Sequence, residues 1–216
     1  MNSLNEHPIA PNSESLRHHF AVRKDTQPGP IDHPDSLAFK YLYDRSGRDA
    51  AVLIPIVQTA QGLKVLLTRR ADHLQKHPGQ ISFPGGSIEA VDNSLVETAL
   101  RETEEEIGVS PENIEVLGAI GSVYTITGYH VTPILGLLRE PLTLTPDPSE
   151  VAEVLTVPLS FLMNPAVFEQ HEHEHENQIR TYYSTYYKTC NKTHRIWGIT
   201  AGIIVGLYEE LRETHR

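Results

Sequence analysis

The stretch ALRETEEEIG, residues 99–108, places four glutamates within five consecutive positions. Upstream, Ser94 and Glu97 have the spacing of a capping box, which marks the start of a helix. Downstream, Gly108 is a residue that commonly ends one. The sequence therefore predicts a helix that runs to about Ile107 and carries a dense cluster of negative charge.

The helical period divides these glutamates into two groups. Each residue turns by about 100°, so Glu102, Glu105 and Glu106 share one face, while Glu104 lies on the other side. Like charges on one face repel unless a cation lies between them, and oxygen ligands suit Mg²⁺ or Mn²⁺. Arg101, four residues before Glu105, is placed to pair with it. The competing interpretation is a solvated acidic face.

Two features upstream favour the metal interpretation. Gly85 and Gly86 form a turn that lets the backbone approach a ligand closely. Basic side chains also gather before this turn: Lys64, Arg69, Arg70, His73, Lys76 and His77. An acidic metal site beside a basic pocket is what a metal-bridged phosphate anion requires.

The acidic stretch resembles the signature of the Nudix hydrolases. That signature is Gly, five residues, Glu, seven residues, then Arg-Glu-aliphatic-x-Glu-Glu-x-Gly-aliphatic, and residues 101–109, RETEEEIGV, match its second half except for Thr103. The first half departs from the signature, because Asp92 replaces the glutamate and eight residues separate it from Arg101. Asp92 is therefore not assigned a catalytic role.

A second motif is similar to the coenzyme A pyrophosphatase branch of this family. Residues 66–71, LLTRRA, are followed at the branch's spacing by Gly79 and by residues 83–86, FPGG. Gln75 stands where the branch has Arg, and the neighbouring Lys76 is able to replace that charge. Residues 128–133, GYHVTP, and 196–201, IWGITA, also resemble the branch, so the likeness extends from about Ala50 to the C-terminus.

The resemblance implies metal-dependent hydrolysis of the pyrophosphate of coenzyme A or acyl-CoA, giving 3′,5′-ADP and 4′-phosphopantetheine or its acyl form. It implies a small-molecule substrate, with Mg²⁺ or Mn²⁺ as cofactor. The expected metal ligands are three carboxylates and one backbone carbonyl: Glu102, Glu105, Glu106 and either Gly85 or Gly86. Glu102, Glu105 and Arg101 are expected in catalysis. The residues expected to bind substrate are Arg70, Lys76, Gly79 and Phe83.

The general base is less defined by the sequence. Glu150 and Glu153, in the segment DPSEVAEV, are candidates because a distant carboxylate takes the proton in many Nudix enzymes. A solvated loop before a strand explains them equally well. One of the box glutamates is a further alternative.

The remaining pattern predicts an α/β (α+β) protein, a Nudix-type α/β/α sandwich with a mixed sheet. We expect residues 1–36 to form an N-terminal arm with a short helix, Ser13–Val22, and residues 37–216 to form a single Nudix domain. Further strands are expected at the following ranges, with a short helix from Pro158 and a last helix over about 196–212: 50–58, 63–69, 80–83, 114–125, 131–138, 151–157 and 179–188.

Composition limits the function classes. A net charge of −10 argues against a general nucleic-acid binder. No apolar run is long enough to cross a membrane, and a single cysteine, Cys190, excludes an internal disulfide and favours the cytoplasm.

HEHEHE, residues 171–176, is expected to be a solvated loop. Trp197 and the tyrosines of residues 182–187 are expected in core or interface packing, which is compatible with a homodimer.

Two alternatives remain open. The first is a Nudix hydrolase for another nucleoside diphosphate derivative, such as NADH, ADP-ribose or an ADP-sugar, for which Gln75 leaves room. The second is a non-catalytic Nudix module that binds a nucleotide. Such modules tend to lose carboxylates of the acidic stretch, whereas all of them are present here.

Overall fold

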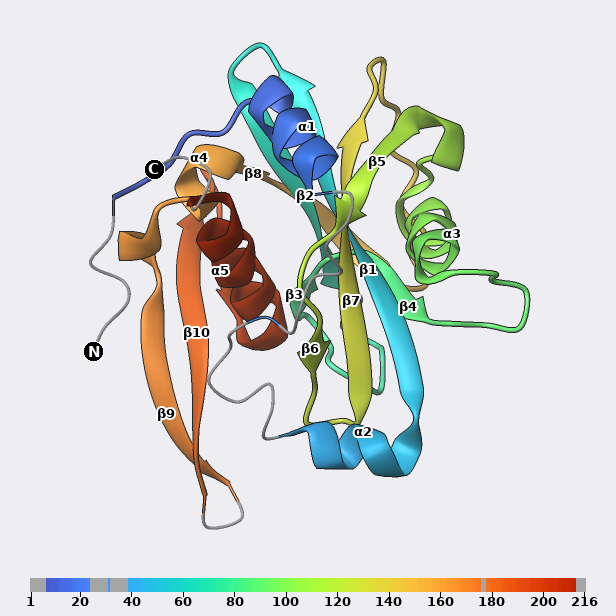
Figure 1. The fold of residues 1–216 in the computed structure, drawn as a ribbon, viewed down its shortest axis with the longest axis vertical. Helices are drawn as coiled ribbons and strands as arrows, with labels where there is room; N and C mark the ends of the chain where they lie inside the picture. Colours follow the sequence, from blue (N-terminus) through green and yellow to red (C-terminus); the bar gives the residue numbers. More distant parts are fainter. Residues whose placement is uncertain (1–6, 24–30, 32–38, 176–177, 213–216) are drawn as a thin grey trace.

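The computed structural model describes residues 7–23, 31, 39–175 and 178–212, whose strands form two sheets (Figure 1). The larger, eight-stranded sheet has the order β3-β2-β1-β7-β5, with β4 pairing to β1, β6 to β7 and β8 to β2. Its strands are β1 Arg48–Thr59, β2 Gly62–Arg70, β3 Ile81–Ser82, β4 Gly85–Ser87, β5 Ile114–Ala119, β6 Val123–Tyr124, β7 Tyr129–Leu138 and β8 Val151–Pro158.

The large sheet is mixed. β1 and β2 form the expected hairpin, while β1 and β7 run parallel along ten paired positions and every other pairing is antiparallel. The strand expected over 114–125 is interrupted, because β5 and β6 are separate and β5 also carries a bulge between Val116 and Gly118.

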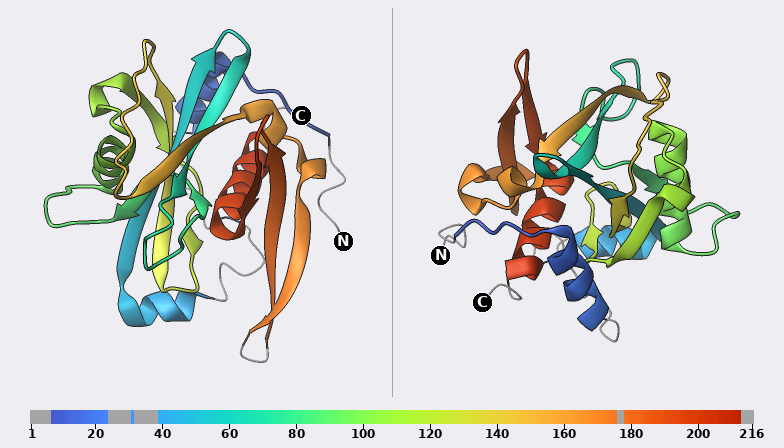
Figure 2. Two further views of the ribbon diagram at one scale, coloured as in Figure 1. Left: turned by 180° about the vertical axis from the view of Figure 1, so that it is seen from behind. Right: turned by 90° about the horizontal axis from the view of Figure 1, so that it is seen from above.

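Helices cover both faces of this sheet. α3, Leu95–Ile107, buries Ala99 and Ile107 against one face, together with Ala51 and Leu53 of β1. α5, Gly198–Arg212, packs on the opposite face, between the large sheet and the small one (Figures 1 and 2). This is the predicted α/β/α sandwich. The shorter helices are α2 Lys40–Ser46, α4 Leu159–Leu162 and the 3₁₀ turns at Pro111–Asn113 and Pro165–Val167.

The ends of α3 follow from local chemistry. The Ser94 hydroxyl accepts from the backbone N–H of Glu97, and Gly108 ends the helix at a φ of 72°. The second half of the expected capping box differs, since the Glu97 carboxylate accepts from the backbone and side-chain N–H groups of Asn93. The caps still fix where the acidic face begins and ends.

The predicted N-terminal helix is confirmed as α1, Ser13–Val22, and it is docked on the domain. Leu16 and Phe20 are buried in the main core, and Phe20 fills the space beside Gly118 of β5. Arg17 forms a bidentate ion pair with Glu115. The part of the predicted arm that the structure describes therefore contributes to the core.

The small sheet has the order β11-β10-β9, formed by β9 Glu169–His175, β10 Gln178–Lys188 and β11 Thr193–Trp197. Two expectations were wrong here. Residues 171–175 form a strand instead of a loop, because β9 pairs with β10. The last helix begins at Gly198 because Ile196 and Trp197 pair with Thr185 and Ser184 of β10.

The aromatic residues of this sheet divide between its two faces. Tyr183 is buried in the main core and Tyr187 packs against it, as expected. Tyr186 and Trp197 are exposed, with Arg195 lying over the Trp197 ring. Packing in the core therefore accounts for only part of the predicted aromatic set.

Candidate active site

The acidic face of α3 lies against the glycines of β4. A Cβ added to Gly86 would lie 2.3 Å from Oε1 of Glu102, so a larger residue would force this carboxylate to move from its place. Gly85 adopts a φ of 155°, and a Cβ there would lie 2.3 Å from the carbonyl oxygen of Ala51. The Gly-Gly pair thus lets β4 pass close to both β1 and the acidic helix.

Glu106 is the most enclosed of the acidic residues on this helix, with 5 % of its surface exposed. Its carboxylate accepts a hydrogen bond from the backbone N–H of Gly85 and a long one, 3.4 Å, from Oγ1 of Thr68. Burial, and secondly the charge of Glu150, raise the pKa of Glu106 to about 8. Among the described residues Glu106 has no ion-pair partner, so it is a buried carboxylate without a direct counter-charge.

This environment predicts a pH dependence of stability in protein stripped of metal with EDTA. The folded pKa of Glu106 lies above the ordinary value of about 4.3, so its contribution to stability is complete below that pH and is lost as the pH rises through about 8. Denaturant unfolding from pH 5 to 9 is expected to show the free energy of unfolding falling by a few kcal/mol. The variant Glu106→Gln should show a shallower slope, and equal slopes would contradict this environment.

Arg101 holds three carboxylates at once. Its Nε and Nη2 donate to the two oxygens of Asp92, each at 2.9 Å, while Nη1 donates to Glu102 at 2.9 Å and to Glu105 at 3.0 Å. The predicted pairing of Arg101 with Glu105 is therefore confirmed. The guanidinium also fixes Glu102, so its role is to position the acidic face.

Asp92 is a residue whose role sequence reasoning missed. Its side chain is only 3 % exposed, and the Arg101 guanidinium holds the pKa of its carboxyl well below the usual range. Asp92 also accepts from the hydroxyl of Thr98 and the N–H of Glu89, which fixes the loop before α3. The sequence signal for this pairing was an acidic residue just before the helix, Asp92, together with an arginine within the helix, Arg101.

The change Asp92→Asn is expected to raise the metal concentration required for half-maximal turnover by about 10- to 100-fold, the usual cost of losing a partner that orients a ligand. The reason is that Arg101 loses its strongest partner and Glu102 its fixed position. A metal titration of turnover measures this. An unchanged metal requirement would show that Asp92 only stabilises the loop before α3 and does not position Glu102.

Arg70 faces this site from the end of β2. Its positive charge lowers the pKa of Glu106, against the larger effect of burial. Its Nε is buried and has no hydrogen-bond partner among the described residues. A buried guanidinium N–H without an acceptor is suited to a phosphate oxygen.

The loop between β2 and β3 brings the second motif to the same place. The N–H of Gly79 donates to the carbonyl of Arg70, and a Cβ on Gly79, at a φ of 68°, would meet the paired side chains of Arg69 and Asp72. Lys76 is exposed in this loop. Phe83, expected to bind substrate, is 4 % exposed and packs in the main core.

The two candidate bases differ in position. Glu150 is exposed, its carbonyl accepts from the N–H of Ala71, and its charge raises the pKa of both Glu102 and Glu106. The carboxylate of Glu153 instead lies 3.3 Å from Nζ of Lys192 and 3.7 Å from Nε2 of His194. The structure thus brings Glu150 toward the acidic face and holds Glu153 at the small sheet.

The donor chemistry fits a hard divalent cation. Glu102 and Glu106 present oxygen ligands, and the buried charge of Glu106 lacks a direct counter-ion among the residues described. The expected set of three glutamates is nevertheless not assembled, since no three His, Cys, Asp or Glu side chains in the described chain are gathered to hold an ion. Arg101 is the physical reason, because it draws Glu105, whose side chain is 59 % exposed, toward itself.

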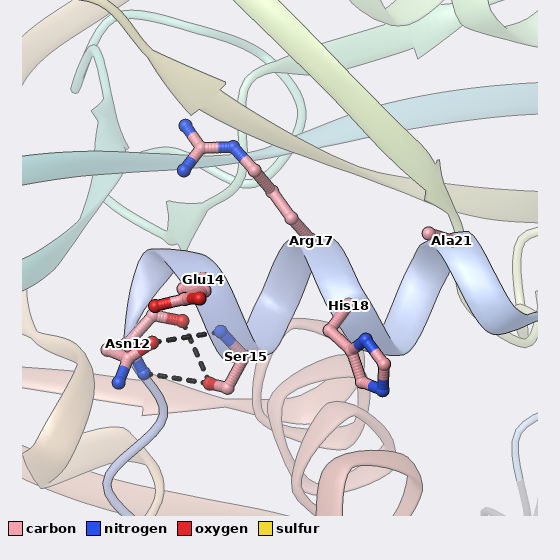
Figure 3. Close-up of a pocket in the computed structure, with 6 residues that line it drawn as sticks. All are labelled: Asn12, Glu14, Ser15, Arg17, His18 and Ala21. Carbon is pink, nitrogen blue, oxygen red and sulfur yellow. Dashed lines mark hydrogen bonds between the residues drawn. The ribbon is translucent and has the colours of Figure 1, made fainter.

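A separate pocket of about 560 Å³ lies along α1 (Figure 3). It contains none of the predicted site residues, and Arg17 within it is already paired with Glu115. Its lining comes from one helix: Asn12, Glu14, Ser15, Arg17, His18 and Ala21. This pocket is a surface feature of the docked helix and does not compete with the acidic face as the active site.

The fold and the acidic face define a class of phosphate-processing hydrolase, and comparison with known proteins gives the family. The NUDIX domain model matches residues 47–182. A protein described as an uncharacterized Nudix hydrolase, NudL, from Enterobacter sp. (strain 638) is 40 % identical over 163 residues, covering 73 % of this chain and 79 % of its own. The NudL of Yersinia pestis (strain Pestoides F) is 37 % identical over 183 residues, covering 84 % and 89 %.

Among solved structures, the NUDIX domain of Shewanella oneidensis NrtR, complexed with ADP ribose, is 20 % identical with a TM-score of 0.46, covering 78 % of this chain and 88 % of that one. The Nudix hydrolase RenU from M. smegmatis is 26 % identical with a TM-score of 0.45, covering 51 % and 70 %. The chain belongs to the Nudix hydrolase family. It is therefore an enzyme of the class that hydrolyses nucleoside diphosphate derivatives, generally with divalent metal ions.

None of the helices that the structure describes is both long and apolar enough to span a membrane.

Proposed function

We propose that the protein hydrolyses the pyrophosphate bond of coenzyme A or acyl-CoA, releasing 3′,5′-ADP and 4′-phosphopantetheine or its acyl form. The observation that carries the proposal is the buried Nε of Arg70, which lacks a hydrogen-bond partner among the described residues, on a side chain whose positive charge lowers the pKa of Glu106. Arg70 belongs to the motif that resembles the coenzyme A pyrophosphatase branch. In this proposal the motif contributes Arg70 as a phosphate-binding group whose charge acts on the acidic face.

The metal ligands in this proposal are Glu102, Glu105 and Glu106, with a backbone carbonyl of Gly85 or Gly86, and the ion is Mg²⁺ or Mn²⁺. When bound, such a cation would neutralise the negative charge of the phosphate oxygens and lower the pKa of a bound water. Glu105 has to exchange its contact with Arg101 for this role. Its 59 % exposed side chain has room to turn.

The chain's own groups then divide the remaining work. Arg70 and Lys76 bind phosphate oxygens, and Gly79 keeps the loop close to Arg70. Arg101 positions Glu102, while Glu150 accepts the proton of the water whose oxygen attacks phosphorus. The bond from that phosphorus to the bridging oxygen breaks, leaving one phosphate on each product.

Gln75 is the reason to retain a second substrate class as an alternative. It is exposed in the same loop as Lys76, at the position where the coenzyme A branch carries arginine. NADH or ADP-ribose is the alternative substrate if that arginine is essential for coenzyme A. A homodimer and a cytoplasmic location stay predictions of the sequence.

A substrate panel tests the proposal. Purified protein with Mg²⁺, and separately with Mn²⁺, is incubated with coenzyme A, acetyl-CoA, NADH and ADP-ribose, and initial rates are compared. We expect the highest kcat/KM on coenzyme A or its acyl form. A higher kcat/KM on NADH or ADP-ribose would favour the alternative.

A further inference from the structure

A Ser-His-Asp constellation lies outside the acidic face. Oγ of Ser122 is 2.7 Å from Nε2 of His130, and Nδ1 of the same ring is 3.3 Å from Oδ1 of Asp49. None of these residues belongs to the acidic stretch or to the loop that contains Arg70. The arrangement is that of a nucleophile, a base and a group that orients the base.

The sheet topology brings these residues together from three segments. β1 and β7 are parallel in a register that places Asp49 beside His130. β6 is antiparallel to β7 and places Tyr124 beside His130. Ser122 precedes Tyr124 by two residues and so faces the same side of the sheet. The juxtaposition therefore depends on regular backbone pairing and not on a loop.

The two contacts of His130 determine its tautomer. An ionised carboxylate only accepts hydrogen bonds, so Asp49 requires the proton of the neutral ring to be on Nδ1. Nε2 then has a free lone pair, and the hydroxyl of Ser122 donates to it. This is the direction in which histidine removes a proton from serine.

Neighbouring aromatic rings hold the imidazole in place. Tyr124 stacks on His130 with a centroid distance of 4.6 Å and an angle of 22°, and Tyr43 of α2 lies 5.2 Å away. The Tyr43 hydroxyl also donates to the Asp49 carboxylate. The His130 side chain remains 24 % exposed and Ser122 is half-buried, so both residues are partly exposed to solvent.

We propose that Ser122, His130 and Asp49 form a second catalytic centre that hydrolyses carboxylic esters. Oγ of Ser122 attacks the carbonyl carbon while its proton passes to Nε2 of His130. The ester C–O bond breaks, and the leaving alcohol takes that proton. Water then attacks the acyl-serine with His130 as base, which releases the carboxylic acid and returns a proton to Ser122.

The chain contains a second serine–histidine contact with which this centre can be compared. Ser184 of β10 lies at the same distance, 2.7 Å, from Nε2 of His171. Ser184 is fully buried, and the acidic neighbour of that ring, Glu169, lies 3.7 Å from the same Nε2 atom instead of from Nδ1. Ser184 therefore differs from Ser122 both in burial and in the placement of the acidic partner, and the proposed centre predicts reaction at Ser122 only.

The test uses an alkyl fluorophosphonate, which phosphonylates an activated serine with loss of fluoride, followed by peptide mass spectrometry of the full-length protein. We expect one adduct, on Ser122, and none on Ser184. Hydrolysis of p-nitrophenyl acetate should fall by about 100-fold in Ser122→Ala and in His130→Gln, the lower range of a general-base contribution. Circular dichroism and thermal melts of both variants establish that they fold.

An unmodified Ser122 in the wild-type protein, or an unchanged esterase rate in Ser122→Ala, would overturn the proposal. Neither reagent contains a pyrophosphate, so the outcome does not depend on the proposed activity toward coenzyme A. Labelling at both Ser122 and Ser184 would equally count against it, since that would show general reactivity of serines beside histidines.

Discussion

Replacing Glu106 by glutamine is expected to lower kcat for metal-dependent turnover by about 10³-fold or more, while the protein stays folded. Several kcal/mol of transition-state stabilisation come from a correctly bound metal ion, and each 1.36 kcal/mol corresponds to a factor of ten in rate. Glu106 is the most buried acidic ligand candidate, and the amide keeps its shape while losing its charge. Steady-state kinetics at saturating Mg²⁺ measure the effect.

The matched control is Glu104→Gln on the same helix. Glu104 is exposed and does not belong to the face that contains Glu102, Glu105 and Glu106, so its change removes the same charge from α3 without touching the site. It should retain wild-type kcat within about twofold, as surface substitutions usually do. Equal losses in both variants would indicate a general electrostatic effect of the helix, and wild-type activity in Glu106→Gln would refute its assignment as a ligand.

The change Arg70→Gln is expected to reduce kcat/KM by about 10- to 100-fold. Charge-assisted hydrogen bonds contribute about 1.5–3 kcal/mol, and Arg70 combines a buried Nε that has no partner among the described residues with a positive charge that acts on Glu106. The fall in kcat/KM should be much larger than any accompanying fall in thermal stability would explain. Kinetics with coenzyme A over a range of concentrations separate KM from kcat.

Lys64→Gln serves as the control for Arg70. Lys64 lies on the same strand, β2, but near its other end, where it contacts Gln61. Removing its charge should leave kcat/KM within about twofold of the wild type. If Lys64→Gln is as impaired as Arg70→Gln, the effect is a non-specific consequence of lower positive charge.

Elements set by local chemistry were predictable from the sequence. The bounds of α1 and α3 follow from caps and periodicity, and both agree with the structure to within a residue. Elements that depend on distant partners were not. β9 is a strand because β10 pairs with it, and β11 takes Ile196 and Trp197 from the expected helix for the same reason.

The site shows the same division. Helical geometry was enough to separate Glu104 from the other glutamates and to pair Arg101 with Glu105. The ion pair of Asp92 with Arg101 could not be predicted, because it depends on how the loop before α3 folds back. The different positions of Glu150 and Glu153 could not be predicted either, because they depend on the register of β8 against β2. The burial of Phe83 in the main core likewise depends on tertiary packing, which its place in the motif does not reveal.

The most direct measurement is the identification of products from coenzyme A by mass spectrometry, with Mg²⁺ and ¹⁸O-labelled water, for the wild type and Glu106→Gln. We expect 3′,5′-ADP and 4′-phosphopantetheine from the wild type, with one ¹⁸O atom incorporated into one of the two product phosphates, and neither product from the variant. Intact coenzyme A after incubation with active wild-type enzyme, or equal product formation by the two proteins, would contradict it.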